Sequence, residues 1–154
     1  MTGAVRVRTA DLDDSDAVLA AYEWLFEPPG KRPQDWDRTR AAARLQRALA
    51  SDRSTVLVAD DGETIVGIAS VYLDLESIRF GQRAWVEDLT VHPEHRSLGI
   101  GKHLLGAAKD WARIHGATRL ALDSGEARVD AHRFYARELP SYRAICFGWN
   151  LTES

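Results

Sequence analysis

The stretch VHPEHRSLGIGKHLL, residues 91–105, carries two closely spaced glycines between an arginine and a helical pattern. Glycine costs about 1 kcal/mol relative to alanine inside a helix, so Gly99 and Gly101 at a helix start indicate that the bare backbone is used. The first amide groups of a helix are unpaired, and the helix dipole adds partial positive charge there. Such a start favours phosphate, and Arg96 and Lys102 could add charge-assisted contacts. The stretch therefore predicts a pyrophosphate-binding loop.

Neighbouring residues decide between three kinds of phosphate loop. A P-loop needs G-x-x-x-x-G-K-[S/T], but His103 follows Lys102 and Arg96 stands where the first glycine would be. A dinucleotide fingerprint G-x-G-x-x-G needs a small residue at position 104, where Leu104 stands. The third pattern, R/Q-x-x-G-x-G/A, is satisfied in full by the run from Arg96 to Gly101.

The elements that must position this loop follow from the periodicity of the chain. Alternating or continuous apolar runs predict strands, and apolar residues at helical spacing predict helices. In chain order we expect a strand at 4–9, helices at 11–26 and 34–51, strands at 54–60, 63–74 and 82–91, a helix at 98–115, a strand at 117–123, a helix at 130–138 and a final strand at 142–151. The order β-α-α-β-β-β-α-β-α-β predicts an α/β (α+β) fold with a mixed central sheet flanked by helices.

Composition narrows the class of protein. The 154 residues, 45% hydrophobic and 28% charged, fit one domain over 1–154 with a real core. The net charge of -3 argues against a nucleic-acid partner. Cys146 is the one cysteine and cannot form an internal disulfide, and no apolar run approaches the roughly 18 residues of a membrane span. Since residues 1–10 carry no signal-peptide pattern, we expect a cytoplasmic protein without a membrane partner.

Two longer segments carry a resemblance to a known family. The run AWVEDLTVHPEHRSLGIGKHLL, residues 84–105, resembles the central strand, cofactor loop and helix of the GNAT superfamily of acyl-CoA-dependent N-acetyltransferases. The run DAHRFYARE, residues 130–138, resembles the later family helix that carries Phe-Tyr. The expected element order is also similar over nearly the full chain. The resemblance implies an N-acetyltransferase that uses acetyl-CoA as cosubstrate and needs no metal.

The family's cofactor contacts map onto this sequence residue by residue. The resemblance implies that the pantetheine arm of acetyl-CoA pairs with the backbone of Leu89, Thr90 and Val91. It implies that the pyrophosphate is held by Arg96, Ser97, Leu98, Gly99, Ile100, Gly101 and Lys102. The family sheet opens between this strand and the next, which places the gap near Ser124 and makes Ser124 a candidate for substrate contact.

The transfer needs a neutral amine, so a base is expected near the acceptor. Glu87 and Asp88 resemble the acidic pair of polyamine-type members, whose glutamate is the proposed base. On a regular strand Glu87 would share one face with Trp85, Leu89 and Val91, and Asp88 would lie on the other. Apolar neighbours would then raise the pKa of Glu87 toward a useful value. The alternative is a structural pair of carboxylates that contacts arginines or loop amides.

The departing thiolate needs a proton, and Tyr135 takes the place of the family tyrosine that supplies it. The alternative is a core tyrosine with a polar tip. A backbone amide within 89–91 would stabilise the developing oxyanion. The sequence departs from the family pattern at three places. Members often have asparagine where Arg128 stands and glycine where Ser97 stands, and many have Gly-Phe or Gly-Tyr where Leu139-Pro140 stand.

The acceptor is the least constrained part of the site. Glu27, Trp36 and Asp37 lie in the segment that borders the family's acceptor site and could select a cationic amine, although helix ends packed by tryptophans would look the same. We expect direct transfer to a primary amine of a small molecule, with Asp88 as a further substrate contact. Alternatives are a protein lysine or N-terminus, an aminoacyl group on RNA, or a sensor that binds acetyl-CoA without turnover. Many relatives form dimers, and the apolar final strand would suit a homodimer interface or a core.

Overall fold

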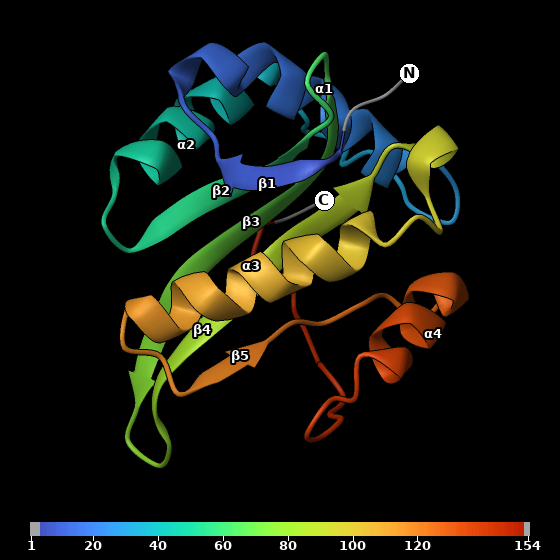
Figure 1. The fold of residues 1–154 in the computed structure, drawn as a ribbon. Helices are drawn as coiled ribbons and strands as arrows, with labels where there is room; N and C mark the ends of the chain where they lie inside the picture. Colours follow the sequence, from blue (N-terminus) through green and yellow to red (C-terminus); the bar gives the residue numbers. More distant parts are fainter. Residues whose placement is uncertain (1–3, 153–154) are drawn as a thin grey trace. The chain divides into compact units, whose positions relative to one another are not determined.

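The computed structural model describes residues 4–152, which form two compact units divided between Leu122 and Asp123. The first unit contains β1 (Arg6–Thr9), η1 (Leu12–Asp14), α1 (Ser15–Phe26), α2 (Arg38–Ala50), β2 (Ser54–Asp60), β3 (Ile65–Ser77), β4 (Gly81–Val91), η2 (Pro93–His95), α3 (Ile100–Ile114) and β5 (Arg119–Ala121) (Figure 1). The second unit contains α4 (Val129–Arg137). None of the helices in the described part of the chain is both long and apolar enough to cross a membrane.

The sheet is mixed, as the sequence predicts. Its strands lie in the order β1-β2-β3-β4-β5, and the first three pairings are antiparallel. The β4–β5 pairing is parallel because α3 crosses over between these two strands. It is also short, joining only Arg83–Trp85 to Arg119–Ala121. The carboxyl half of β4 therefore extends past its pairing with β5.

Helices cover both faces of this sheet (Figure 1). On one face, α1 and α2 enclose an apolar cluster with Val58 and Ile68 at its centre, both fully buried. On the other face, α3 packs Ile100 and Leu104 against Val86 and its neighbours. Burial of each such side chain stabilises the fold by roughly 1.5–3 kcal/mol. The α3 face thus anchors the first turn of the helix that follows the glycine loop.

Gly67 on β3 lets α3 approach the sheet closely. A Cβ at this position would lie 3.0 Å from Cδ1 of Leu104, 3.2 Å from Cγ2 of Ile100 and 3.3 Å from the carbonyl oxygen of Thr90. Such distances are tighter than ordinary packing contacts. The missing side chain of Gly67 therefore fixes how near the start of α3 lies to β3 and β4.

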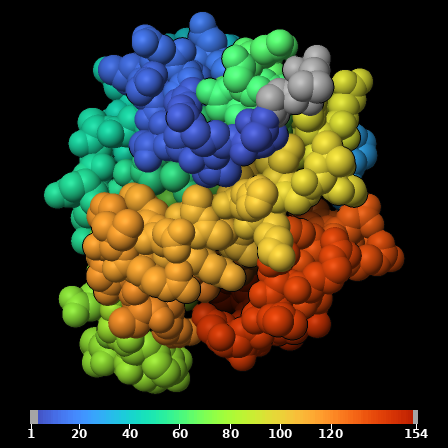
Figure 2. Space-filling view, viewed as in Figure 1, coloured from blue at the N-terminus to red at the C-terminus, as the bar shows by residue number. Residues whose placement is uncertain are grey.

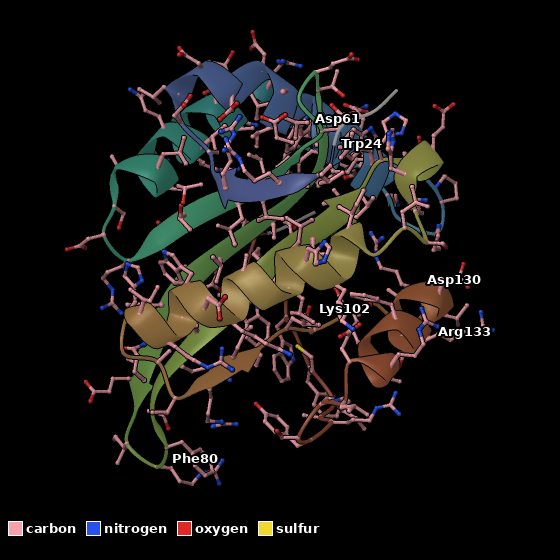
Figure 3. All side chains as sticks on the ribbon, viewed as in Figure 1. Trp24, Asp61, Phe80, Lys102, Asp130 and Arg133 are labelled. Carbon is pink, nitrogen blue, oxygen red and sulfur yellow. The ribbon has the colours of Figure 1, made fainter. Side chains whose placement is uncertain are left out.

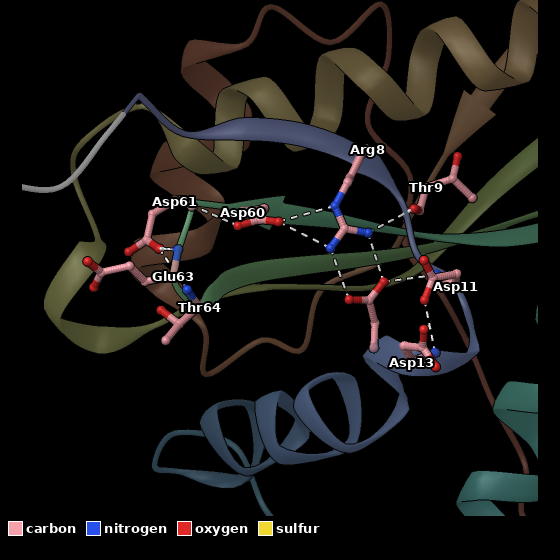
Figure 4. A network of polar contacts seen from close by, with 10 residues as sticks. Arg8, Thr9, Asp11, Asp13, Asp60, Asp61, Glu63 and Thr64 are labelled. Carbon is pink, nitrogen blue, oxygen red and sulfur yellow. Dashed lines mark hydrogen bonds and ion pairs between the residues drawn. The ribbon is translucent and has the colours of Figure 1, made fainter.

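An arginine ties the edge strand β1 to the rest of the first unit (Figure 4). The Arg8 guanidinium donates to both carboxylate oxygens of Asp14, at 2.8 and 2.9 Å, and to Asp60 at 3.1 and 3.2 Å. The hydrogen bonds from Arg8 hold the pKa of Asp14 below its usual value. Paired, charge-assisted bonds of this kind are stronger than neutral ones, so the network joins β1, β2 and the start of α1.

The tip of the β3–β4 hairpin stands out from the surface of the first unit (Figure 2). Leu75 and Ile78 are exposed there. Phe80, labelled in Figure 3, has the guanidinium of Arg79 4.3 Å and that of Arg119 4.4 Å from its ring centroid. These cation–π contacts cover part of the exposed ring.

The predicted final strand is wrong. Residues 138–152 contain no helix or strand, and Ile145, Phe147, Trp149 and Leu151 are 76–95% exposed. A strand exists only where its backbone pairs with another strand, and the described part of the second unit contains no other strand. The apolar alternation of this segment is real, but alternation alone does not supply a pairing partner.

Candidate active site

A β-bulge in β4 shapes the site. Val86 pairs in register with Val71 and Asp88 pairs with Ser70, so Glu87 is an additional residue between them. A bulge bends the strand and changes which side the following residues face. Val86 before the bulge and Leu89 after it both pack in the α3 cluster. The strict alternation expected for this strand is therefore broken at Glu87.

Glu87 and Asp88 consequently lie on the same side of β4, and the expectation of opposite faces is wrong. Asp88 bonds to Tyr22 of α1, and the charges of both carboxylates act on the Tyr22 hydroxyl. Glu87 is exposed and accepts the Trp85 indole N–H at 3.0 Å. We expected Glu87 to lie among Leu89 and Val91, but the bulge turns those two side chains to α3, and Glu87 does not lie beside them.

Tyrosines flank both carboxylates. Burial first, and the nearby charge of Glu87 second, raise the pKa of Tyr72 above its ordinary value. Burial, and then Asp88, raise the pKa of Tyr22 far above its ordinary value. The Tyr22 hydroxyl is therefore protonated at neutral pH and donates to Oδ2 of Asp88 at 2.7 Å. Ser70 donates to the same oxygen at 3.2 Å.

The backbone of β4 offers hydrogen-bonding groups on its open side. The amide of His92 donates to the carbonyl of Val66 at 2.8 Å, which sets the alternation of the β3–β4 ladder. That alternation directs the backbone groups of Thr90 to β3 and those of Leu89 and Val91 away from it. The Val91 carbonyl accepts Nε of Arg96 at 3.1 Å. Of the three residues expected to pair with pantetheine, two thus present their backbone groups on the side away from β3.

The glycine loop ends in the helix start that the sequence predicts. Gly99 is the N-cap of α3 with φ of 85°, and Ser97 has φ of 65°. A Cβ at Gly99 would meet nothing within 4 Å, so the space before the helix is open. Leu98 is exposed and lies before the helix, which begins at Ile100 rather than at Leu98. Lys102 lies in the first turn (Figure 3), beside the amides of Ile100 and Gly101.

Aromatic side chains cover the end of α1 and the loop after it. Trp36 stacks on Tyr22 with ring centroids 5.8 Å apart and meets Phe26 edge-on at 4.9 Å. Asp37 accepts the Arg40 amide at 3.0 Å as the N-cap of α2, which holds its pKa below the usual value. Glu27 is exposed at the C-cap of α1. Trp36 therefore joins the cluster that carries Tyr22, whereas Asp37 serves as a helix cap.

The second unit contains the two remaining candidates. Tyr135 lies on α4 and is half-buried. Burial raises the pKa of its hydroxyl above the ordinary value, because the opposing effect of the Arg128 charge is smaller. The Ser124 hydroxyl oxygen is buried and has no hydrogen-bond partner among residues 4–152. Cys146 is exposed, and its contact with Asp123 raises the pKa of its thiol.

The described part of the chain, residues 4–152, contains no cluster of side chains that could bind a metal ion. No group of three or more His, Cys, Asp or Glu side chains within residues 4–152 is arranged to hold an ion. Nδ1 of His92 accepts the Glu94 amide at 3.1 Å, and the His92 ring packs edge-on against Trp24.

Sequence patterns missed Tyr22, Ser70, Tyr72 and Gly67. The partners of Asp88 come from α1 and β3, far away in sequence, and no local signal announces a bulge. The β3 pattern contained Gly67 as an isolated glycine within a strand, which marks a bulge or a close backbone approach. That signal could have identified Gly67.

Comparison with known proteins identifies the family of this chain. The model of the Acetyltransferase (GNAT) family matches residues 18–139. The chain belongs to the GNAT family. Two curated relatives are also named N-acetyltransferases. The uncharacterised N-acetyltransferase YhdJ of Bacillus subtilis is 46% identical over a segment that covers 62% of this chain and 68% of the relative. The aminoalkylphosphonate N-acetyltransferase of Salmonella typhimurium is 35% identical over 86% of this chain and 82% of the relative. This GNAT protein is accordingly an N-acetyltransferase, a member of the acyltransferase class.

Solved structures agree on the fold. The aminoglycoside N-acetyltransferase AAC(6')-Iy in complex with CoA superposes with a TM-score of 0.82 at 14% identity, covering 99% of this chain and 98% of that one. At this identity the likeness concerns the fold alone. It confirms the expected GNAT architecture of a mixed sheet with flanking helices.

Proposed function

We propose that this GNAT protein transfers the acetyl group of acetyl-CoA to a primary amine of a small molecule, by direct attack in a ternary complex. One observation carries the proposal: a single strand, β4, presents an exposed carboxylate, outward backbone groups and a glycine loop in succession. Glu87 lies at the bulge, Leu89 and Val91 follow it, and the start of α3 follows Gly99. These are the base, the oxyanion donor and the phosphate site that acyl transfer from a phosphorylated carrier needs.

The residues present fit acetyl-CoA, which supplies the thioester. The open space before Gly99 and the amides of Ile100, Gly101 and Lys102 would hold the pyrophosphate, since a helix start is an anion site. Arg96 is anchored to Val91 through Nε, and its remaining guanidinium donors would supply further charge-assisted contacts. The outward carbonyl of Leu89 and the outward amide of Val91 would pair with the pantetheine arm.

Glu87 removes a proton from the substrate ammonium, directly or through a water. The neutral amine then forms a C–N bond to the acetyl carbonyl carbon, and the C–S bond breaks. The amide of Leu89 stabilises the negative charge that develops on the carbonyl oxygen. Tyr135 donates its proton to the departing thiolate. The proton that the new amide nitrogen loses returns through water to the Tyr135 phenolate, and Glu87 releases its proton to solvent. Because Tyr135 belongs to the second unit, this proposal requires residues 1–154 to act as one catalytic domain. Ser124 would be a further substrate contact in it.

The acceptor is a small cationic amine. Carboxylates and aromatic faces both attract cations, and Glu87 lies on the α1 side of β4, where Tyr22 joins Trp36 and Phe26. The Salmonella relative is named for a small amine, an aminoalkylphosphonate. A protein lysine or N-terminus is the competing acceptor.

Two copies associate through the C-terminal segment. Ile145, Phe147, Trp149 and Leu151 alternate along it and are 76–95% exposed. At about 150 Å² each they would bury about 600 Å² per copy, close to the roughly 800 Å² per partner of a stable interface. Light scattering should give the mass of a dimer, and Phe147→Ser with Trp149→Ser should halve it; a monomeric wild type contradicts this.

The experiment that tests the activity is thiol release from acetyl-CoA across a panel of small amines and lysine-containing peptides. Release with a small amine, and little with any peptide, is the expected result. Release with peptides alone would move the acceptor to proteins. Tight binding of acetyl-CoA without release for any acceptor would overturn the catalytic proposal in favour of a sensor.

A further inference from the structure

We propose that Ser70 and Tyr22 are positioning residues that act through Asp88. Together they hold the β4 bulge that directs Glu87 to the acceptor side and the Leu89 amide to the open edge. The inference rests on the proposed function, because it gives these two residues a purpose in the same transfer. Neither residue needs to touch a substrate.

The contacts form a closed ring around Asp88. Ser70 Oγ accepts the Asp88 amide N–H at 3.1 Å and donates its own hydrogen to Oδ2 of Asp88 at 3.2 Å. Tyr22 donates to the same Oδ2 at 2.7 Å. Asp88 is thus held by its backbone from β3 and by its side chain from both β3 and α1. All three contacts are partly buried, where hydrogen bonds to a charged group are worth more than at the surface.

This ring stabilises the bulged pairing of β4 directly. A bulge adds one residue, and the competing regular pairing would turn side chains of β4 to the other face. Ser70 lies at the register position of Asp88, next to the shift between Ser70 and Val71. Its hydroxyl binds the amide and the carboxylate of one residue, so it favours the bulged pairing over a slipped one. Raised pKa keeps Tyr22 protonated as the second donor.

The consequence reaches both reacting partners of the strand. The peptide unit between Glu87 and Asp88 ends at the amide that Ser70 binds, so its plane sets the direction in which Glu87 leaves the strand. Leu89 follows Asp88 directly, and the orientation of its amide depends on the same bulge. A misplacement of about 1 Å at a reacting group can cost about a hundredfold in rate.

Ser70→Ala and Tyr22→Phe test this role, with Ser70→Thr as the conservative variant. Ser54→Ala is the matched control, since Ser54 also lies on a strand, is partly buried and donates to a backbone carbonyl, that of Ala48 at 2.9 Å. We expect Ser70→Ala and Tyr22→Phe to lower kcat about ten- to hundredfold with less than a twofold change in the Kd of acetyl-CoA. Ser70→Thr should restore most of kcat, and Ser54→Ala should leave it unchanged.

Amide hydrogen exchange separates this inference from the proposed function. In Ser70→Ala the amide of Asp88, which Ser70 binds in the wild type, should exchange at least tenfold faster than in Ser54→Ala, whether or not an acceptor is known. If the wild type releases no thiol with any amine, the proposed function fails while this exchange result still supports the clamp. Wild-type kcat in both variants, or exchange at Asp88 that matches Ser54→Ala, would overturn it. Lowered kcat in Ser54→Ala to the same degree would also overturn it, because the loss would then be general.

Discussion

Gly67→Ala should weaken both the fold and the binding of acetyl-CoA, because the added methyl group meets the start of α3. The new Cβ would lie 3.0 Å from Leu104, 3.2 Å from Ile100 and 3.3 Å from the carbonyl of Thr90. Overpacking of a core typically costs about 1–3 kcal/mol, and the loss of chain freedom on replacing glycine returns about 0.4–1 kcal/mol. A net loss of about 1–2 kcal/mol would lower the Tm by roughly 2–8 °C for a chain of this size.

The same shift should be felt in the cofactor loop. Relief of the contact moves the first turn of α3 away from β3, and the amides that follow Gly99 move with it. We expect acetyl-CoA affinity, measured by titration calorimetry, to fall about tenfold, equivalent to ~1.4 kcal/mol.

Gly106→Ala is the matched control for Gly67→Ala. Gly106 lies within α3, and a Cβ there would meet nothing within 4 Å, so this change should stabilise the protein by about 0.4–1 kcal/mol without altering affinity. Urea unfolding and calorimetry on both variants decide the matter. If Gly67→Ala matches the wild type in both stability and affinity, the close approach does not position the loop.

Three further predictions concern separate parts of the molecule. Gly99→Val should weaken acetyl-CoA binding at least tenfold in calorimetry, because a side chain would fill the space through which the phosphate approaches. Gly62→Val has a similar left-handed backbone and open surroundings, so it should be strained to a similar degree but keep its affinity for acetyl-CoA. Equal losses of affinity in both variants would contradict the loop assignment. Glu87→Gln should lower kcat about a hundredfold at neutral pH and less at high pH, where the amine is already neutral, and an unchanged pH–rate profile would place the base elsewhere. Arg8→Met should cost about 2 kcal/mol at pH 7; because the folded pKa of Asp14 is lowered, this loss should persist above about pH 4 and shrink as the pH falls through that folded value, and a pH-independent loss in urea unfolding would show that the charge pair is not responsible.

The glycine loop and α3 could be predicted because their information is local. The glycines, the arginine before them and the helical period after them all lie within residues 91–114, and Gly116 ends the helix with φ of 86°. The family match agrees with the architecture inferred from this region. Local patterns of this kind depend on backbone preference and on one buried face, both of which a sequence displays.

The bulge and the final strand could not be predicted because they depend on partners far away in the chain. Alternation along β4 assumes one residue per register position. Only the pairing with β3, in which Ser70 faces Asp88 and Val71 faces Val86, shows that Glu87 is additional. The segment 142–151 has a strand's alternation, but a pattern does not name the strand that must pair with it. The prediction of apolar surroundings for Glu87 was wrong because it relied on the same unbroken alternation along β4.

Hydrogen exchange of the wild-type protein with and without acetyl-CoA tests the central claim most directly. Saturating acetyl-CoA should protect the amides of Ile100, Gly101 and Lys102 together with those of Leu89 and Val91, and leave the ladder amide of Thr90 unchanged. Protection confined to other segments, with these amides unaltered, would contradict the assignment of β4 and the start of α3 as the cofactor half of the site.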